Sequence, residues 1–253
     1  MKKLLALLLL VPPLLVPVAW GAEEGYQLDR APDLSTDQAA LQSGAKLFVN
    51  YCLNCHSASS MRYSRLQDLG LSEDQIKQNL LFTGDKVGEL MRVAMTSKDA
   101  KEWFGASPPD LSVIARAKSS ERGSGADYIY SYLRTYYKDD ARPTGWNNLA
   151  YPNSAMPHVL WQLQGIHNAV YVDKKGEDGK PIHEFEKFEE ATPGTMTPLQ
   201  YDRSVASITA FLSWMGEPAH ETRRRIGVWV LLFLGVTFIL TWRLNASYWK
   251  EVK

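Results

Sequence analysis

Two cysteines and a histidine lie together in Cys52-Leu53-Asn54-Cys55-His56, and the 253-residue chain contains no other cysteine. On one helical turn, positions i, i+3 and i+4 share a face, so both sulfurs and the imidazole can meet one planar group. This spacing is the attachment pattern of c-type haem. The sequence therefore predicts one covalently bound haem c, with Cys52 and Cys55 as attachment residues and His56 as an iron ligand.

Two other roles for a cysteine pair fit this sequence less well. A thioredoxin-like redox pair opens a helix after a strand, whereas we expect helical flanks on both sides of this motif. A structural zinc ion needs four ligands, and the sequence has no second cysteine pair.

An electron-transfer haem needs a second axial ligand, usually methionine or histidine. Met156 precedes a proline, which favours an extended strap that can present a thioether to iron. Met196 has similar surroundings and is the alternative. Met91 and Met95 are four residues apart on an expected helix and are interpreted as core residues. We interpret His158 as a surface residue or as a support for the ligands.

Both ends of the chain carry export or membrane signals. Residues 1–22 combine a basic start, an apolar run and small residues, which predicts a signal peptide. Residues 226–242 are 17 uncharged residues flanked by arginines, and they span about 25 Å as a helix. We expect a transmembrane anchor at 223–245 and a cytoplasmic tail at 246–253. The haem domain, 23–222, would then lie in the periplasm, on the inner membrane.

The formal net charge of zero hides an uneven distribution. Residues 23–222 contain 20 basic and 27 acidic residues, a net charge of about −7. This balance argues against a nucleic-acid binder and suits a basic partner or simple solubility. Six acidic residues lie within 177–190, and both a solvated loop and a docking patch fit this segment.

A helix is expected just before the motif. Residues 35–37 include good capping side chains. Gly44 lies inside this helix, where glycine costs about 1 kcal/mol relative to alanine, so we expect another helix to approach closely there. Residues 201–215 are the candidate partner.

Further stretches resemble the cytochrome c1 family, the haem c subunits of cytochrome bc1 complexes. They are residues 48–57, Met61-Arg62-Tyr63, Trp103-Phe104-Gly105, and residues 108–112, 125–130, 142–148, 152–160 and 215–218. The resemblance covers nearly the whole mature chain. It implies a mainly α protein: a class I cytochrome c-like haem domain with long loop insertions and one C-terminal transmembrane helix.

The resemblance also implies roles for individual residues. Met156 would be the sixth iron ligand, the Pro109 carbonyl would accept the His56 ring N–H, and Tyr128 would lie near a haem propionate. The family's propionate-binding arginine corresponds to Lys118 here, so three basic residues are candidates for this contact: Arg116, Lys118 and Arg122.

The function implied is electron relay in quinol–cytochrome c reductase, without quinol binding by this subunit. The expected partners are cytochrome b, the Rieske iron–sulfur protein and a mobile c-type cytochrome, within a dimeric complex, and no nucleic acid. The main alternative is a membrane-anchored monohaem cytochrome c that serves another reductase or a terminal oxidase. A haem sensor or peroxidase and an assembly scaffold with structural haem are further alternatives.

Overall fold

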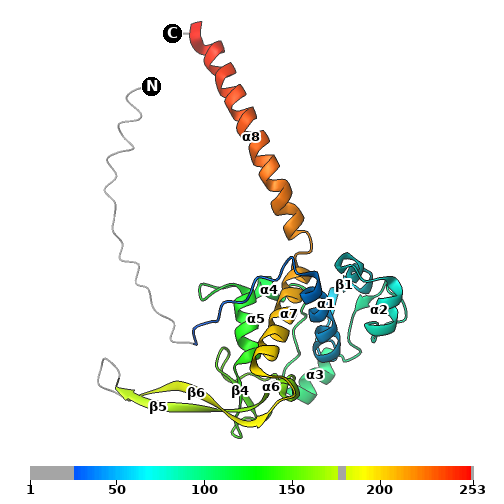
Figure 1. Ribbon diagram of the computed structural model, residues 1–253, viewed down its shortest axis with the longest axis vertical. Helices are drawn as coiled ribbons and strands as arrows, with labels where there is room; N and C mark the ends of the chain where they lie inside the picture. The colour runs from blue at the N-terminus through cyan, green and yellow to red at the C-terminus, as the bar shows by residue number, and fades with distance from the viewer. Residues whose placement is uncertain (1–25, 176–180, 252–253) are drawn as a thin grey trace.

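The computed structural model describes residues 26–175 and 181–251. The expected signal peptide, as well as Glu177 and Asp178, lies outside the described residues. The α-helices are α1 (Gln38–Leu47), α2 (Glu73–Asn79), α3 (Ser97–Phe104), α4 (Ile114–Ala117), α5 (Gly125–Arg134), α6 (Trp161–Gln164), α7 (Pro198–Gly216) and α8 (His220–Tyr248) (Figure 1). A π-helical turn, η1 (Phe48–Cys52), follows α1 directly, and two 3₁₀ segments are η2 (Tyr63–Leu69) and η3 (Trp249–Glu251).

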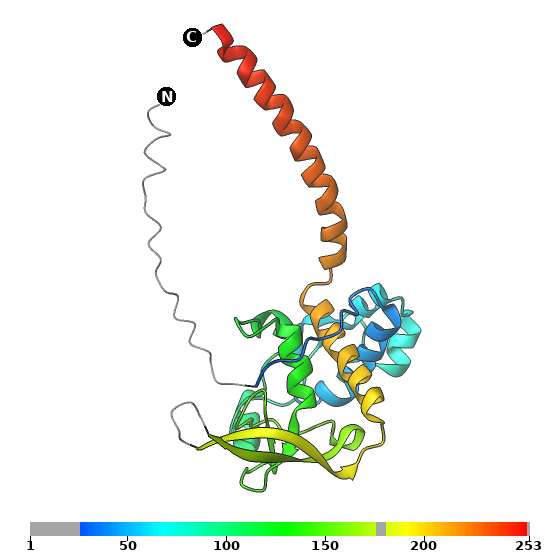
Figure 2. The same ribbon diagram turned by 60° about the vertical axis from the view of Figure 1, so that its left-hand side comes forward.

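The described strands form three antiparallel pairs. They are β1 (Ala58–Arg62) with β2 (Leu90–Met91), β3 (Tyr136–Lys138) with β4 (Trp146–Asn148), and β5 (Gly165–Lys175) with β6 (Pro181–Pro193). The β5–β6 hairpin is a long arm that runs beneath α5 and α7 and extends past them in both views (Figures 1 and 2).

The first and last helices of the globular part cross as the sequence predicts. The Asp37 side chain caps α1 by accepting the Ala40 N–H at 3.0 Å. A Cβ placed at Gly44 would lie 2.1 Å from the Ser207 carbonyl oxygen and 2.7 Å from the Phe211 Cβ. Only glycine therefore lets α1 and α7 approach this closely. The crossing lies at the centre of the core, where Phe48 and Phe211 are fully buried.

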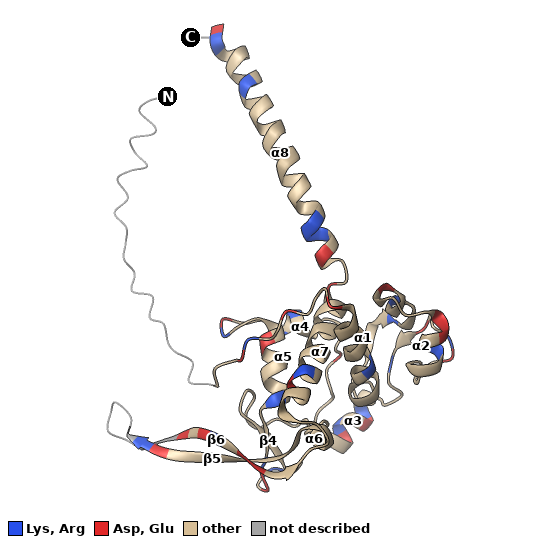
Figure 3. Ribbon diagram, viewed as in Figure 1, with Lys and Arg blue, Asp and Glu red and all other residues tan. Residues whose placement is uncertain are grey.

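Helix α8 leaves the globular part as a single long rod (Figure 2). It is long and apolar enough to cross a membrane, and none of its apolar window is buried against the protein. Charged residues gather towards its two ends, and residues 226–242 carry none (Figure 3). The helix extends beyond both sides of the anchor predicted at 223–245.

Three local expectations were wrong. The motif is followed by the strand β1 rather than by a helix. Met91 is a buried core residue, as expected, but it lies on β2, and Met95 lies half-buried in the loop before α3. The acidic segment is not a loop, because its described acidic residues belong to β6.

The helix crossing yields a prediction for Gly44→Ala. The substitution improves helix propensity by about 1 kcal/mol, but it forces a methyl group into the backbone of α7. Overpacking of this kind costs on the order of 1–3 kcal/mol, so we expect a net loss in the free energy of unfolding. Chemical denaturation of the detergent-solubilised chain measures this loss. The matched control is Ser43→Ala at an exposed position of α1, and equal stability of both variants would contradict the prediction.

Candidate functional site

The cysteine–histidine motif forms one compact turn. The Cys52 carbonyl accepts the Cys55 N–H at 3.1 Å and the His56 N–H at 2.9 Å. The π-helical turn η1 leads into it, and such bulges are frequent at functional sites. These two main-chain hydrogen bonds close a single turn over residues 52–56, which carries both thiols and the imidazole.

Both thiols are free, and burial keeps them protonated. Cys52 is buried and Cys55 is half-buried. Burial, and then the neighbouring Cys55, raise the pKa of Cys52 to about 12, and burial also raises the pKa of Cys55. The pair is therefore held as two neutral thiols in an apolar setting, and buried cysteines of this kind are poor thiolate nucleophiles.

The His56 ring is held in one orientation. Its Nδ1 lies 2.7 Å from the Pro109 carbonyl oxygen, the contact that the family resemblance implies. A ring that donates from Nδ1 keeps an unprotonated Nε2, the form that binds metals. Burial lowers the pKa of His56, with partial opposition from the Pro109 carbonyl and the Asp110 charge, so the imidazole is neutral at pH 7.

The segment that carries Pro109 is itself fixed to the chain just after the motif. The Leu111 N–H donates to the Ser57 carbonyl at 2.8 Å, and the Asp110 carboxylate accepts the Ser59 N–H at 2.8 Å. Burial alone would raise the pKa of Asp110, but hydrogen bonds from Ser112 and Ser59 outweigh it and lower the pKa. The carboxylate is therefore charged at neutral pH and tethers this segment.

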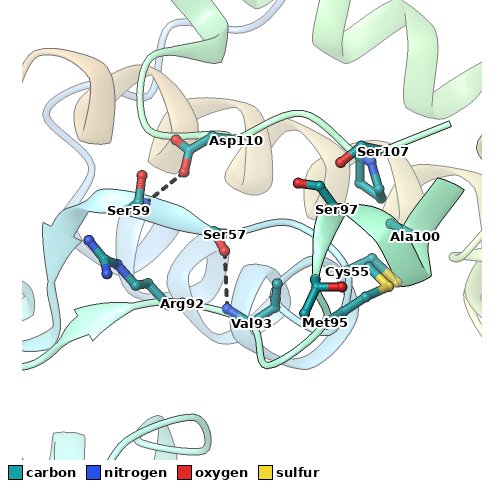
Figure 4. Close-up of a pocket in the computed structure, with 12 residues that line it drawn as sticks. Cys55, Ser57, Ser59, Arg92, Val93, Met95, Ser97, Ala100, Ser107 and Asp110 are labelled. Carbon is teal, nitrogen blue, oxygen red and sulfur yellow. Dashed lines mark hydrogen bonds between the residues drawn. The ribbon is translucent and has the colours of Figure 1, made fainter.

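A cavity of about 360 Å³ opens beside the motif. Cys55 and Met95 line one end, and Arg92 and Asp110 line the other (Figure 4). The cavity walls come from the motif and the start of β1, from the loop before α3 and α3 itself, and from the proline segment.

Met156 and Met196 both pack, half-buried, against the same core. The Met156 carbonyl oxygen lies 3.1 Å from the Tyr136 hydroxyl and 3.4 Å from the Ser154 hydroxyl. The thioether of Met196 instead accepts a hydrogen bond from the Ser204 hydroxyl at 3.5 Å. The same Ser204 hydroxyl lies closer to the Gln200 carbonyl, at 2.9 Å, so its single proton leaves the Met196 sulfur only weakly engaged; the hydrogen bonds of Met156 involve its main chain.

His158 lies in the interior, so its expected surface position was wrong. Its side chain is 2% exposed, and the ring stacks on Tyr136 at 4.8 Å and meets Trp146 edge-on at 5.2 Å. Burial is the main reason that its pKa falls to about 3. His158 is therefore a neutral aromatic packing residue next to the Met156 strap.

The three basic candidates have different surroundings. The Lys118 ammonium lies 5.1 Å from the Tyr128 ring centroid and 5.6 Å from that of Tyr151. Arg122 donates to the Tyr26 carbonyl at 2.7 Å, which ties it to the N-terminal segment. Exposed Arg116 lies beside Gly216 at the end of α7. Lys118 alone of the three is placed over Tyr128.

The acidic strand β6 is partly neutralised. Lys174 pairs with Glu184 at 2.9 Å, and Lys187 pairs with Glu189 at 3.3 Å. These pairs reduce the negative field of the arm, so its charge alone gives weak support for a docking patch.

The described residues fit a covalently held haem. Two neutral thiols and a neutral, oriented imidazole lie on one turn, and each S–H group could add across a vinyl group of the haem, with sulfur bonding to one carbon and the proton to the other. Soft sulfur and imidazole donors are the axial ligands that haem iron takes in electron-transfer proteins. The sequence did not single out Tyr132, Tyr136 and Ser154, whose hydroxyls lie beside the Met156 carbonyl or next to one another. The spacing of four between Tyr128, Tyr132 and Tyr136 is typical of residues on one face of a helix.

The chain is similar to known proteins along almost its entire length. A model of the Cytochrome C1 family matches residues 31–252. A cytochrome c1 of Allochromatium vinosum is 45% identical over 252 residues, which cover 99% of both chains. A Nitrosomonas europaea protein named ammonia monooxygenase gamma subunit is 44% identical over 252 residues, which cover 100% of this chain and 99% of that one. A cytochrome c1 of Rhodospirillum rubrum is 29% identical over 249 residues, which cover 86% of this chain and 83% of that one.

The family match, the full-length similarity and the cysteine–histidine turn all agree, and the chain belongs to the cytochrome c1 family.

Proposed function

We propose that this chain receives single electrons from the Rieske protein of a cytochrome bc1 complex and passes them to a mobile c-type cytochrome. Members of this family carry one covalently bound haem c and are the electron-transfer subunits of that complex. The observation that carries the proposal is the turn at 52–56, where the His56 ring is oriented by the Pro109 carbonyl beside two free thiols.

Each residue of the site would have a different role in holding the cofactor. Cys52 and Cys55 would form the two thioether bonds, and His56 would bind the iron through Nε2. The haem, when bound, supplies a reversible one-electron couple. The Pro109 carbonyl fixes the His56 tautomer, and hydrogen bonds to the His ring increase its basicity as a ligand. The buried side chains around the turn exclude water.

Met156 is the proposed sixth ligand. It lies on an irregular strap whose main chain is held by hydroxyl groups, so its side chain is left available. Met196, whose sulfur lies 3.5 Å from the Ser204 hydroxyl, is the alternative ligand. A thioether ligand raises the potential relative to a second histidine and leaves no open position for substrate.

Lys118 is the proposed partner of a haem propionate, together with Tyr128. Its ammonium lies over the Tyr128 and Tyr151 rings, a position that favours cation–π attraction and places a positive charge beside Tyr128. Lysine acts there as a point charge, whereas arginine would give a bidentate contact.

We further propose that α8 anchors the protein in the inner membrane, with the haem domain in the periplasm and the C-terminus in the cytoplasm. An anchor raises the effective concentration of the domain near its electron donor. Cytochrome b and the Rieske protein would be neighbours in a dimeric complex. We expect no quinol oxidation by this chain alone, since that reaction belongs to another subunit.

A second candidate function is service to a different oxidoreductase. The observation in its favour is the similarity to the Nitrosomonas europaea protein named ammonia monooxygenase gamma subunit. The haem site would work in the same way in either case, and only the neighbours would differ.

Gentle detergent purification from native membranes decides between these candidates. We expect cytochrome b and a Rieske protein to co-purify with the chain in equal amounts, at one haem c per chain. Subunit identification and a haem inventory measure this outcome. Co-purification with monooxygenase or oxidase subunits instead would overturn the proposed complex.

The ligand assignment predicts the behaviour of Met156→Leu. The haem should stay covalently bound, because the cysteines are untouched. Loss of the thioether should lower the midpoint potential, remove the sulfur-to-iron charge-transfer absorption and admit carbon monoxide to the reduced protein. Optical redox titration and a carbon monoxide difference spectrum measure these changes. Met196→Leu is the matched control, and a reversed result in the two variants would assign the ligand to Met196.

The propionate assignment predicts that Lys118→Gln lowers the midpoint potential by tens of millivolts. A nearby positive charge disfavours the more positive ferric form, so its removal stabilises that form. Optical redox titration of the haem-loaded chain measures the shift. Arg116→Gln is the control at an exposed site, and a larger shift in this control would transfer the role to Arg116.

A further inference from the structure

We propose that the Tyr136 and Ser154 hydroxyls, which are joined through the Tyr132 hydroxyl, position the Met156 thioether by fixing the carbonyl group of the same residue. This inference rests on the proposed role of Met156 as an iron ligand. It assigns a ligand-positioning task to Tyr136 and Ser154, which contribute no donor atom to the iron.

The network is a closed ring of four oxygen atoms. The Tyr136 hydroxyl can donate its single proton either to the Tyr132 hydroxyl, at 2.6 Å, or to the Met156 carbonyl, and the Tyr132 and Ser154 oxygens are also 2.6 Å apart. The Met156 carbonyl oxygen completes the ring, at 3.1 Å from Tyr136 and 3.4 Å from Ser154. The two contacts between hydroxyl oxygens, at 2.6 Å, are at the short end of the range for neutral O–H···O hydrogen bonds. Linked hydrogen bonds also polarise one another.

The number of protons makes the carbonyl an obligatory acceptor. The three hydroxyls hold three protons for four contacts, and a carbonyl has none to give. If neither Tyr136 nor Ser154 donated to Met156, both would have to donate to Tyr132. Each of the two contacts of Tyr132 would then already hold a proton, and the Tyr132 proton would have no hydrogen-bond partner in the ring. At least one of the two hydroxyls therefore donates to the Met156 carbonyl in every arrangement that uses all three protons within the ring.

The two tyrosines stand on ordered elements, while Ser154 and the Met156 carbonyl lie on the same irregular strap. Tyr132 belongs to α5, where its ring stacks on Tyr128 at 5.8 Å. Tyr136 begins β3, is 1% exposed and stacks on His158. The strap contains the left-handed residue Asn153 (φ 63°) and has no helix or strand of its own to hold it. The hydroxyl ring thus ties the ligand strap to the rigid part of the fold.

The consequence concerns ligand exchange. Breaking a metal–thioether bond requires the strap to move, and a fixed carbonyl restrains that movement. Removing the restraint should make Met156 easier to displace, without any change in the ligand atoms themselves. One hydrogen bond of this kind is typically worth less than a tenfold change in an equilibrium constant, and two are worth about tenfold.

The experiment measures displacement of the thioether by imidazole in the ferric, haem-loaded full chain in detergent. The apparent dissociation constant is followed by the loss of the sulfur-to-iron charge-transfer absorption. The variants are Tyr136→Phe, Ser154→Ala and the double variant of both. Tyr132→Phe is the matched control, because it removes a hydroxyl from the ring but leaves two donors for the carbonyl.

We expect the double variant to bind imidazole about tenfold more tightly than the wild type, and Tyr136→Phe about threefold. Ser154→Ala should change less than Tyr136→Phe, since its contact with the carbonyl is longer. Tyr132→Phe should stay within about twofold of the wild type. If the double variant fails to fold, the order of the three single variants decides the question.

An imidazole affinity within about twofold of the wild type in the folded double variant would overturn the network. So would a change in Tyr132→Phe that equals or exceeds the change in Tyr136→Phe. Met156→Leu separates this failure from failure of the ligand assignment. If Met156→Leu keeps the charge-transfer absorption, the ligand assignment is wrong; if it loses the absorption while the double variant behaves as wild type, only the network is wrong.

Discussion

The hydrogen bond between the His56 ring and the Pro109 carbonyl is the contact on which the site depends. It joins two segments that are 53 residues apart in the sequence. The Asp110 carboxylate and the Leu111 N–H add a second and a third tie to the chain that follows the motif. Without these ties the imidazole could rotate on its own turn, and the cysteine spacing alone would not define the direction of its Nε2. The proline segment is therefore part of the proposed haem site, although it offers no iron ligand.

The two sides of the proposed haem site are held in place by different kinds of interaction. On the histidine side, a charged carboxylate and main-chain hydrogen bonds fix a polar segment at the edge of the core. On the methionine side, neutral hydroxyl groups and stacked rings hold an irregular strap. On the methionine side these hydrogen bonds involve the Met156 main chain rather than its proposed ligand atom. The close crossing of α1 and α7 at Gly44 supports the motif from behind, because η1 continues directly from α1.

Local signals in the sequence predicted a good part of this structure. The capping side chain of Asp37, the cost of glycine at Gly44 and the uncharged run at 226–242 each have a physical meaning that requires no partner to be known. The strand after the motif was missed because β1 is stabilised by pairing with β2, about 30 residues away. The hairpin was missed because irregular register near Val170 and Tyr171 interrupts the alternation of apolar residues. No sequence pattern could reveal the contact of Tyr136 with Met156, since it involves a main-chain carbonyl in a loop.

The junction between α7 and α8 has a consequence for how the protein meets other molecules. Only residues 217–219 separate the two helices, and three residues reach at most about 10 Å. Glu217 contacts both His220 and Arg223 across this junction, which shortens its free length further. So short a linker keeps the globular domain from making large movements away from the end of α8. The proposed electron donor and acceptor would therefore have to move to the haem domain, which stays at a nearly fixed distance from the end of α8.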